Sequence, residues 1–199
     1  MLRLGLTGGI ASGKSTVAAM LREMGFRVLE ADVVSHKLFE RGQDAHDEVL
    51  KEFGAEFADA NGQIDRARLG ALVFADPEKL KKLNAILHPR VEREILRVFD
   101  EWEKSGVKDA AFVEAALLVE AGISKKLDGL VVAYCRPEQQ IERLQVRGMS
   151  EKDARQRIAA QMPVEEKLRF ATEKIDCSGT LEETRTQVRA LASKLRAMR

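Results

Sequence analysis

A glycine-rich run near the start of the chain has the residues needed to bind phosphate. The pattern G-x-x-x-x-G-K-[ST] is matched by Gly8-Gly9-Ile10-Ala11-Ser12-Gly13-Lys14-Ser15. Glycines let the backbone curl, so that successive N–H groups at a helix N-terminus point into one concavity that holds phosphate oxygens. Lys14 offers a positive charge to the β- and γ-phosphates, the Ser15 hydroxyl can ligate Mg²⁺, and the Thr16 N–H can reach the α-phosphate. The run therefore predicts a site for a nucleoside triphosphate with Mg²⁺.

The residues around this run predict the elements that would position it. Leucines alternate with other residues over 2–6, which is typical of a short strand. Apolar residues recur at helical spacing over 17–24, and Gly25 can end that helix. Residues 26–30 read as a second strand. A strand, a helix and a strand within some 30 residues form a βαβ unit, which requires a parallel sheet.

The rest of the chain alternates in the same way, so the sequence predicts an α/β protein. Further strands are expected at 110–115, at 130–135 and, more weakly, at 174–177. The long stretch 33–106 has a mostly helical pattern, and helices are also expected after Pro137, from Ser150 and over 181–198.

Asp32 follows the second predicted strand. The carboxyl ends of parallel strands border the crevice in which ligands bind. A carboxylate there would face the same crevice as the phosphate run and could accept the proton of a hydroxyl group. The alternative is a structural one, in which Asp32 caps the helix that follows.

Arginines gather on a two-helix segment that follows a core strand. Arg143 and Arg147 are four residues apart and so share one helical face, and Gly148 breaks the helix just after them. Arg136, Arg155 and Arg157 belong to the same segment. In a small kinase such a segment is a lid, whose arginines neutralise charge on the phosphates when the site closes. The alternative is a solvated helical face on which the arginines alternate with acidic residues.

Overall composition excludes several classes of protein. The chain has 199 residues, of which 45% are hydrophobic, so it can form one folded domain with inserted subdomains. Its 33 basic and 32 acidic residues give a net charge of +1, which gives no drive toward nucleic acid or an anionic membrane. No apolar run approaches a membrane span, and the first residues lack the features of a signal peptide. Two cysteines are too few for a disulfide scaffold or zinc site, so we expect a cytoplasmic protein.

The phosphate run alone leaves the use of the nucleotide open. A guanine-reading Asn-Lys-x-Asp element is missing, because Asn61 precedes Gly and Asn84 precedes Ala. A second glycine-rich loop of the transport-ATPase type is missing too. A metabolic kinase remains the leading interpretation. The alternatives are another small-molecule or nucleoside-monophosphate kinase, and a binding or switch module that hydrolyses nucleotide slowly.

Over nearly its whole length the chain resembles the dephospho-CoA kinases. The residues that carry the resemblance are the run Leu6 to Val17, Ala31-Asp32, Phe53-Gly54, Gly62 to Arg66 with Leu69, Phe74, Leu87-His88-Pro89, Leu117-Leu118-Val119-Glu120, Gln140 to Arg147 and Arg157 to Gln161. The phosphate run is generic, whereas His88-Pro89, Leu117 to Glu120 and the placement of Asp32 are specific to the family. Without this resemblance, His88 and Arg66 would be taken as structural or surface residues.

The resemblance implies ATP-dependent phosphorylation of the ribose 3′-hydroxyl of dephospho-CoA, the last step of coenzyme A synthesis. It implies a P-loop NTPase fold with a five-stranded parallel sheet, a helical substrate-binding insertion and a helical lid. The implied domains are a nucleotide-binding core of 1–32, 108–135 and 170–199, a substrate domain of 33–107 and a lid of 136–169. ATP, Mg²⁺ and dephospho-CoA are the expected partners of a monomer or small homo-oligomer.

The resemblance also assigns roles to individual residues. Catalysis falls to Asp32, Lys14 and Arg143, and Ser15 binds the metal. ATP binding falls to Gly8, Gly9, Ile10, Ala11, Ser12, Gly13, Lys14, Ser15, Thr16, Arg143 and Arg147. Substrate binding falls to Asp32, Arg66, His88, Leu117 and Glu120. The chain departs from the family pattern at Glu30 and at Ala116, where Asp and Pro are usual, and at Cys177, where Asn is common near the adenine. This last departure leaves base selectivity open.

Overall fold

The computed structural model describes residues 1–198 and divides into two compact units. One unit comprises Met1–Glu30 and the chain from Glu101 onward, and the other comprises Ala31–Asp100. The chain thus leaves the first unit after its second strand and returns to it before its third. The finer division into core, substrate domain and lid stays a prediction.

The first unit is built on a five-stranded parallel sheet, as the sequence predicts. Its strands are β1 (Leu2–Thr7), β2 (Arg27–Glu30), β3 (Ala110–Glu114), β4 (Gly129–Tyr134) and β5 (Glu173–Asp176). They lie in the order β2-β3-β1-β4-β5, and every neighbouring pair is parallel. The fifth strand, the weakest in the sequence pattern, begins and ends one residue before its predicted bounds.

β1 lies at the centre of this sheet, between β3 and β4. Leu6 pairs with Glu114 on one side and with Val131 on the other. After β1 the chain first forms β2 and β3 on one side of it, and later forms β4 and β5 on the other side. The loop after β1 therefore begins at the point where the strand order reverses, which is where ligands bind in open α/β sheets.

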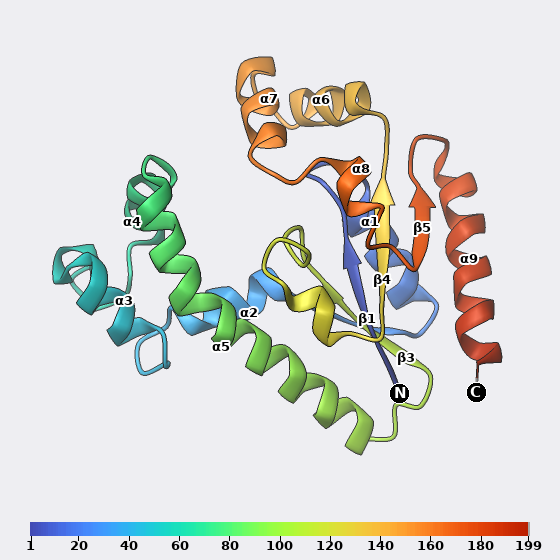
Figure 1. Cartoon of the computed structure of the whole chain (residues 1–199), viewed down its shortest axis with the longest axis horizontal. Helices are drawn as coiled ribbons and strands as arrows, with labels where there is room; N and C mark the ends of the chain where they lie inside the picture. Colours follow the sequence, from blue (N-terminus) through green and yellow to red (C-terminus); the bar gives the residue numbers. More distant parts are fainter. Residues whose placement is uncertain (199) are drawn as a thin grey trace. The chain divides into compact units, whose positions relative to one another are not determined.

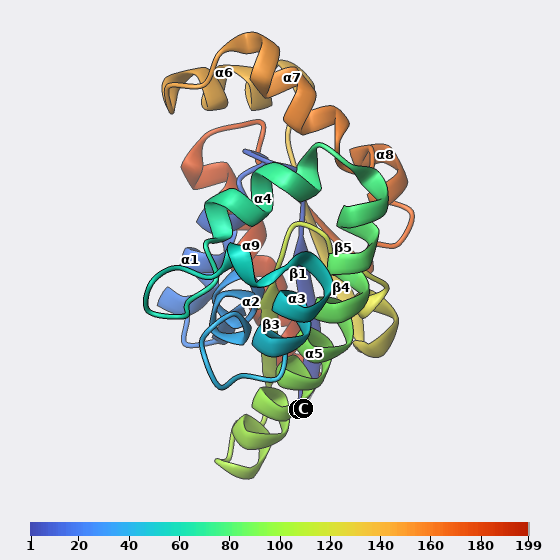
Figure 2. The same cartoon turned by 90° about the vertical axis from the view of Figure 1, so that its left-hand side faces the viewer.

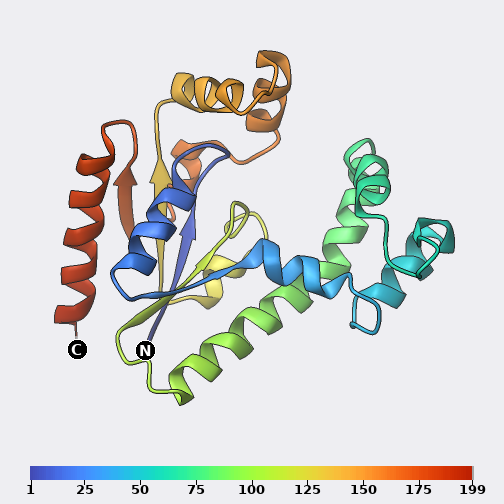
Figure 3. The same ribbon diagram turned by 180° about the vertical axis from the view of Figure 1, so that it is seen from behind.

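Helices of the first unit pack on this sheet and extend beyond its carboxyl edge. They are α1 (Lys14–Glu23), η2 (Ile123–Lys126), α6 (Pro137–Val146), α7 (Glu151–Ala159), α8 (Val164–Lys167) and α9 (Leu181–Ala197). Figure 3 shows α1 and α9 on the same face of the sheet, where they contact each other. Figures 1 and 2 both show α6 and α7 beyond the carboxyl ends of β1 and β4. The segment that the sequence predicts to be a lid thus lies beyond the carboxyl edge of the sheet, where ligands bind.

Local sequence signals fix where several of these helices begin. The Ser150 hydroxyl accepts from the Asp153 N–H at 3.1 Å and so caps α7, at the position that the sequence predicts. Thr180 and Glu183 form a reciprocal capping box at the start of α9. Pro137 is the first residue of α6, where its missing N–H costs nothing.

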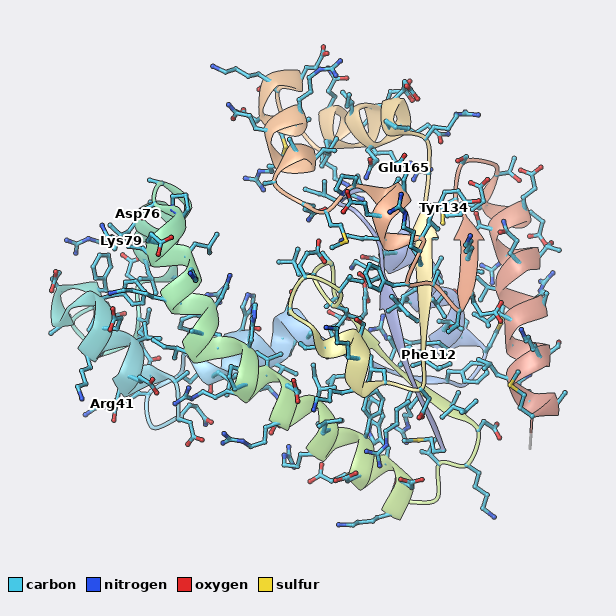
Figure 4. All side chains as sticks on the ribbon, in the orientation of Figure 1. Arg41, Asp76, Lys79, Phe112, Tyr134 and Glu165 are labelled. Atoms are coloured by element: carbon cyan, nitrogen blue, oxygen red, sulfur yellow. The ribbon has the colours of Figure 1, made fainter. Side chains whose placement is uncertain are left out.

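The hydrophobic core of the first unit lies between the sheet and the α1–α9 layer. It contains buried residues of β1, β3, β4 and β5 together with Val17 and Leu21 of α1 and Val188 and Leu191 of α9. Phe112 of β3 is fully buried there and meets the Phe26 ring edge-to-face, with the ring centroids 5.7 Å apart. Figure 4 shows Phe112 in the middle of the sheet.

The second unit is helical, as the pattern of residues 33–106 predicts. It contains α2 (Ala31–Leu38), α3 (His46–Phe53), η1 (Ala55–Phe57), α4 (Arg66–Phe74) and most of α5 (Pro77–Lys104). Ion pairs join α3 and the turn before it to α5, among them Lys82 with Glu52 at 2.6 Å and Arg90 with Glu48. Although α5 has 28 residues, no helix within residues 1–198 is both long and apolar enough to cross a membrane.

Asp76 fixes the start of α5. Its carboxylate accepts from the backbone N–H groups of Glu78 and Lys79, and Figure 4 shows the Asp76 and Lys79 side chains close together. The hydrogen bond from the Lys79 backbone, more than any other cause, lowers the pKa of Asp76, because it stabilises the ionised form.

Replacing the central aromatic residue should weaken the whole first unit. We expect Phe112→Ala to lower the free energy of unfolding by about 3–5 kcal/mol, since it leaves a large cavity under the sheet. Phe170→Ala is the control, because that ring is 51% exposed, and it should cost less than about 1 kcal/mol. Urea denaturation of the three proteins measures both values, and equal losses would contradict this account of the core.

Candidate active site

The phosphate-binding loop connects β1 to α1 with a backbone that depends on its small residues. Gly13 has φ 101°, and Ala11, with φ 57°, is the one non-glycine residue of positive φ among residues 1–198. A Cβ at Gly8 would lie 2.2 Å from the Ala133 carbonyl oxygen, and one at Gly13 would lie 2.8 Å from the Cys177 Cβ. These two glycines therefore let the loop lie against the ends of β4 and β5.

One buried side-chain hydroxyl of this loop has no hydrogen-bond partner among the described residues. The Ser12 side chain is 1% exposed, and its Oγ makes no hydrogen bond to any residue that the structure describes. Buried polar groups without partners are rare, because desolvation without a hydrogen bond is costly. An unpaired hydroxyl in the middle of a curled loop fits a loop that a ligand completes.

A buried carboxylate, that of Glu114, binds the side chains of Lys14 and Ser15 at the start of α1. Glu114 Oε1 accepts from Lys14 Nζ at 2.7 Å and from Ser15 Oγ at 3.0 Å. Glu114 is only 7% exposed, and Arg22 lies 3.8 Å from its second oxygen. The sequence analysis missed Glu114 as a site residue. The available signal was its place at the end of an apolar strand, but its meeting with Lys14 depends on the pairing of β3 with β1.

The oxygens at this point fit a magnesium ion. Hydroxyl and carboxylate oxygens, here those of Ser15 and Glu114, are ligands that Mg²⁺ accepts. Within the described part of the chain there is no group of three His, Cys, Asp or Glu side chains that could hold a metal alone. Because Mg²⁺ is commonly held by one or two protein oxygens together with substrate phosphates, this sparse set suits it.

The two predicted lid arginines differ in their contacts. Arg143 donates to the Ala11 carbonyl oxygen at 3.1 Å and to the Cys177 carbonyl oxygen at 2.7 Å, so it joins the loop to the end of β5. Arg147 is exposed at the end of α6, where it lines a hollow with Gly148 and Ser150. Arg155 instead pairs with Glu151 on one exposed face, as the solvated-face alternative describes.

The loop after β3 brings Glu120 to a buried lysine. Lys167 of α8 has no exposed side-chain surface, and its Nζ lies 2.9 Å from Glu120 Oε1. The same Nζ donates to the Ala116 carbonyl oxygen at 2.6 Å, and Thr7 Oγ1 donates to that oxygen at 3.1 Å. Glu120 is therefore tied to the core by an ion pair that the sequence analysis missed. Leu117, also predicted for the substrate site, is 44% exposed.

Three predicted site residues belong to the second unit. β2 ends at Glu30 and α2 begins at Ala31, so Asp32 is an exposed residue in the first turn of the helix. Arg66, the first residue of α4, donates to His36 Nε2 at 2.6 Å. His88 lies in the middle of α5 in a shallow hollow with Leu80 and Asn84, and burial lowers the pKa of its imidazole.

Cys135 and Cys177 lie under the loop, at the ends of β4 and β5. Both are buried free thiols, and the register that pairs Tyr134 with Asp176 brings these next two residues side by side. Burial raises the pKa of Cys177 to about 11, and the neighbouring Cys135 adds to the shift. Burial also raises the pKa of Cys135. Tyr134, visible at the carboxyl end of β4 in Figure 4, likewise has a raised pKa, mainly through burial.

The chain is similar to the members of one enzyme family. Residues 2–183 match the family model described as dephospho-CoA kinase. The chain is 43% identical to the dephospho-CoA kinase of Geobacillus kaustophilus, over 99% of this chain and 98% of the relative. It is 45% identical to that of Aquifex aeolicus, over 98% of each. The crystal structure of TT1252 from Thermus thermophilus superposes with a TM-score of 0.79 at 35% identity, covering 98% of this chain and 97% of that one.

The reactivity of the two cysteines tests whether they are buried under the loop, because burial raises the pKa of both thiols. Thiolate, the form that attacks alkylating reagents, becomes abundant at Cys177 only as the pH approaches about 11. We expect iodoacetamide at pH 8 to leave both cysteines unmodified in the native protein and to modify both after denaturation in urea. Mass spectrometry of the intact protein counts the adducts. Rapid native labelling at pH 8 would contradict the buried placement of these thiols.

Proposed function

The chain belongs to the dephospho-CoA kinase family, and on that premise we propose that it transfers the γ-phosphoryl group of ATP to the ribose 3′-hydroxyl of dephospho-CoA. The products are coenzyme A and ADP. The observation that carries this proposal is the cluster of Lys14, Ser15 and Glu114 beside a glycine-rich loop at the switch point of the sheet. A charged, oxygen-rich site of this kind is suited to phosphoryl transfer, in which the protein mainly positions groups and stabilises charge.

The loop and Lys14 bind the triphosphate in this proposal. The loop N–H groups between Gly8 and Thr16 surround the phosphate oxygens, apart from those of Ile10 and Ser12, which donate to Gln161 and to the Gly9 carbonyl oxygen. Lys14 turns from Glu114 toward the β- and γ-phosphates. Ser15 and Glu114 are the residues that would hold Mg²⁺. When bound with ATP, Mg²⁺ offsets the negative charge that develops on the phosphates.

Asp32 is the proposed proton acceptor. The ribose 3′-oxygen attacks the γ-phosphorus as the bond from that phosphorus to the β,γ-bridging oxygen breaks. The hydroxyl proton passes to the Asp32 carboxylate, and ADP keeps the bridging oxygen. Asp32 supports this role because it lies two residues after the last residue of β2 and its side chain is exposed.

The remaining predicted residues bind the two substrates. We assign dephospho-CoA to Arg66, His88, Leu117 and Glu120, the first as a cation for the substrate's anionic groups. Arg143 and Arg147 are assigned to ATP, and the contact of Arg143 with the loop carbonyl of Ala11 supports its assignment. We place the enzyme in the cytoplasm as a monomer or small homo-oligomer that acts on small molecules without nucleic acid or membrane.

A product assay tests this function against its two alternatives. The purified protein is incubated with ATP, Mg²⁺ and a panel of alcohols that includes dephospho-CoA, and mass spectrometry follows each acceptor and free phosphate. We expect dephospho-CoA to gain one phosphoryl group for each ADP formed, and Lys14→Ala to lose turnover by orders of magnitude. Because this change also removes the cation beside the buried Glu114 carboxylate, it is assayed at a temperature at which circular dichroism shows the variant folded. Phosphorylation of a different acceptor would favour another kinase, and free phosphate alone would favour a switch module.

Removing the proton acceptor should separate chemistry from binding. We expect Asp32→Asn to lower kcat by about 10²-fold or more, because general-base help is typically worth that much. Asn keeps the size of the side chain, so the binding of ATP and of dephospho-CoA should stay within several-fold of the parent. Single-turnover phosphorylation and calorimetric titration with each substrate measure the two effects.

Glu78→Gln serves as the control for that variant. Glu78 is an exposed acid in the first turn of α5, so its replacement also removes a negative charge from a helix N-terminus. We expect its kcat to equal that of the parent. A retained kcat in Asp32→Asn would remove this residue from the mechanism, and an equal loss of stability and activity would assign it a role in stabilising the first turn of α2 instead.

A further inference from the structure

Two glutamines from opposite ends of the lid segment contact the same residue of the phosphate-binding loop. Gln140 lies in α6, just after the lid segment leaves β4, and Gln161 follows α7, where the segment returns. Gln140 Nε2 donates to the Ile10 carbonyl oxygen at 2.8 Å, and the Ile10 N–H donates to Gln161 Oε1 at 2.8 Å. Both polar groups of one loop residue are thus satisfied by side chains of the lid segment.

These contacts lie in the packed interior around the loop rather than on the exposed surface. Gln140 is only 7% exposed. A Cβ on Gly9 would lie 2.7 Å from Gln140 Nε2 and 3.7 Å from Gln161 Oε1, so both amides also lie close to the preceding loop residue. A buried amide that lost its partner would pay the full cost of desolvation, so Gln140 is held to its bond, whereas Gln161 is half-buried.

The residue that follows Ile10 needs support. Ala11 has φ 57°, a left-handed conformation that residues with a Cβ rarely adopt. Its carbonyl oxygen accepts from Arg143 at 3.1 Å, and the Cys135 thiol lies 3.8 Å from the same oxygen. A strained residue in a binding loop persists where its surroundings hold it in place. Gln140 and Gln161 hold the residue immediately before it, because they bind both the carbonyl oxygen and the N–H of Ile10.

We propose that Gln140 and Gln161 are positioning residues, which hold Ile10 and Ala11 in the phosphate-binding conformation and couple that conformation to the lid segment. The proposal deepens the proposed function and rests on it for the identity of the acceptor. Its binding part needs only that the loop holds a nucleoside triphosphate.

The physical consequence concerns the direction of the loop N–H groups. A loop that drifts from its bound form points its donors away from the phosphates, and misplacement by about 1 Å can cost about 10²-fold in rate. ATP affinity should suffer less, since ATP can restore the loop conformation at the expense of one neutral hydrogen bond. Dephospho-CoA affinity should not change.

The two hydrogen bonds run in opposite directions, and this makes a sharp test. Gln161 accepts from Ile10, so Glu at position 161 can keep the bond. Gln140 donates to Ile10, so Glu at position 140 would bring two oxygens together. Leu at either position removes the bond with similar side-chain volume. Because both Glu variants add the same charge near the phosphates, the comparison between positions cancels that effect to first order.

The experiment measures kcat, calorimetric Kd for ATP with Mg²⁺, Kd for dephospho-CoA and the melting temperature of five variants. These are Gln140→Leu, Gln140→Glu, Gln161→Leu, Gln161→Glu and the control Gln145→Leu, whose side chain is exposed on α6. Each Leu variant of the pair should lose about tenfold or more in kcat and about three- to tenfold in ATP affinity. The control should match the parent in every measurement.

The decisive quantity is the ratio of kcat in the Glu variant to kcat in the Leu variant. We expect this ratio at position 161 to exceed the ratio at position 140 by about tenfold, a pattern that general loss of packing does not produce. Equal ratios, or activity losses that only follow the melting temperature, would overturn the proposal. If the parent fails to phosphorylate dephospho-CoA but the ATP affinities still show the expected losses, the proposed acceptor is wrong and the positioning role stands.

Discussion

The Glu114 carboxylate is the group on which the phosphate site depends. It is almost fully buried, and an unpaired charge in that position would be strongly destabilising. Lys14 and Ser15 supply its partners, so the first turn of α1 is fixed to the end of β3. The pairing of Leu6 with Glu114 places this carboxylate beside the loop, which makes the parallel register of the sheet a condition of the site.

The loop before this helix is also held by α6 and by the end of β5. Arg143 contacts the carbonyl groups of both Ala11 and Cys177, and the Cys177 side chain would clash with any side chain at Gly13. The buried Cys177 thiol adds an apolar surface under the loop. The bond of Cys177 with Arg143 uses the backbone carbonyl oxygen, so this contact does not depend on the identity of the side chain.

Local signals in the sequence predicted much of the fold, whereas contacts between residues far apart in the sequence could not be predicted from them. The glycine-rich run, the alternating leucines and the Ser150 cap depend on neighbouring residues, and their predicted structures are confirmed. The sequence placed Asp32 after a strand but could not locate the helix boundary at Ala31, because such boundaries depend on tertiary packing. Glu114 and Lys167 meet their partners across separations of 100 and 47 residues, which no local pattern encodes.

The charge balance of the site explains why cations must accompany a triphosphate there. A carboxylate beside several phosphate oxygens is repelled by them, and low polarity around a buried group makes that repulsion stronger. Lys14 can compensate part of it by lying between Glu114 and the phosphates. The proposed Mg²⁺, held by oxygens of Ser15 and Glu114, would change Glu114 from a repulsive neighbour into a ligand. A single buried carboxylate can therefore order the loop and also favour a metal-bound triphosphate over a free one.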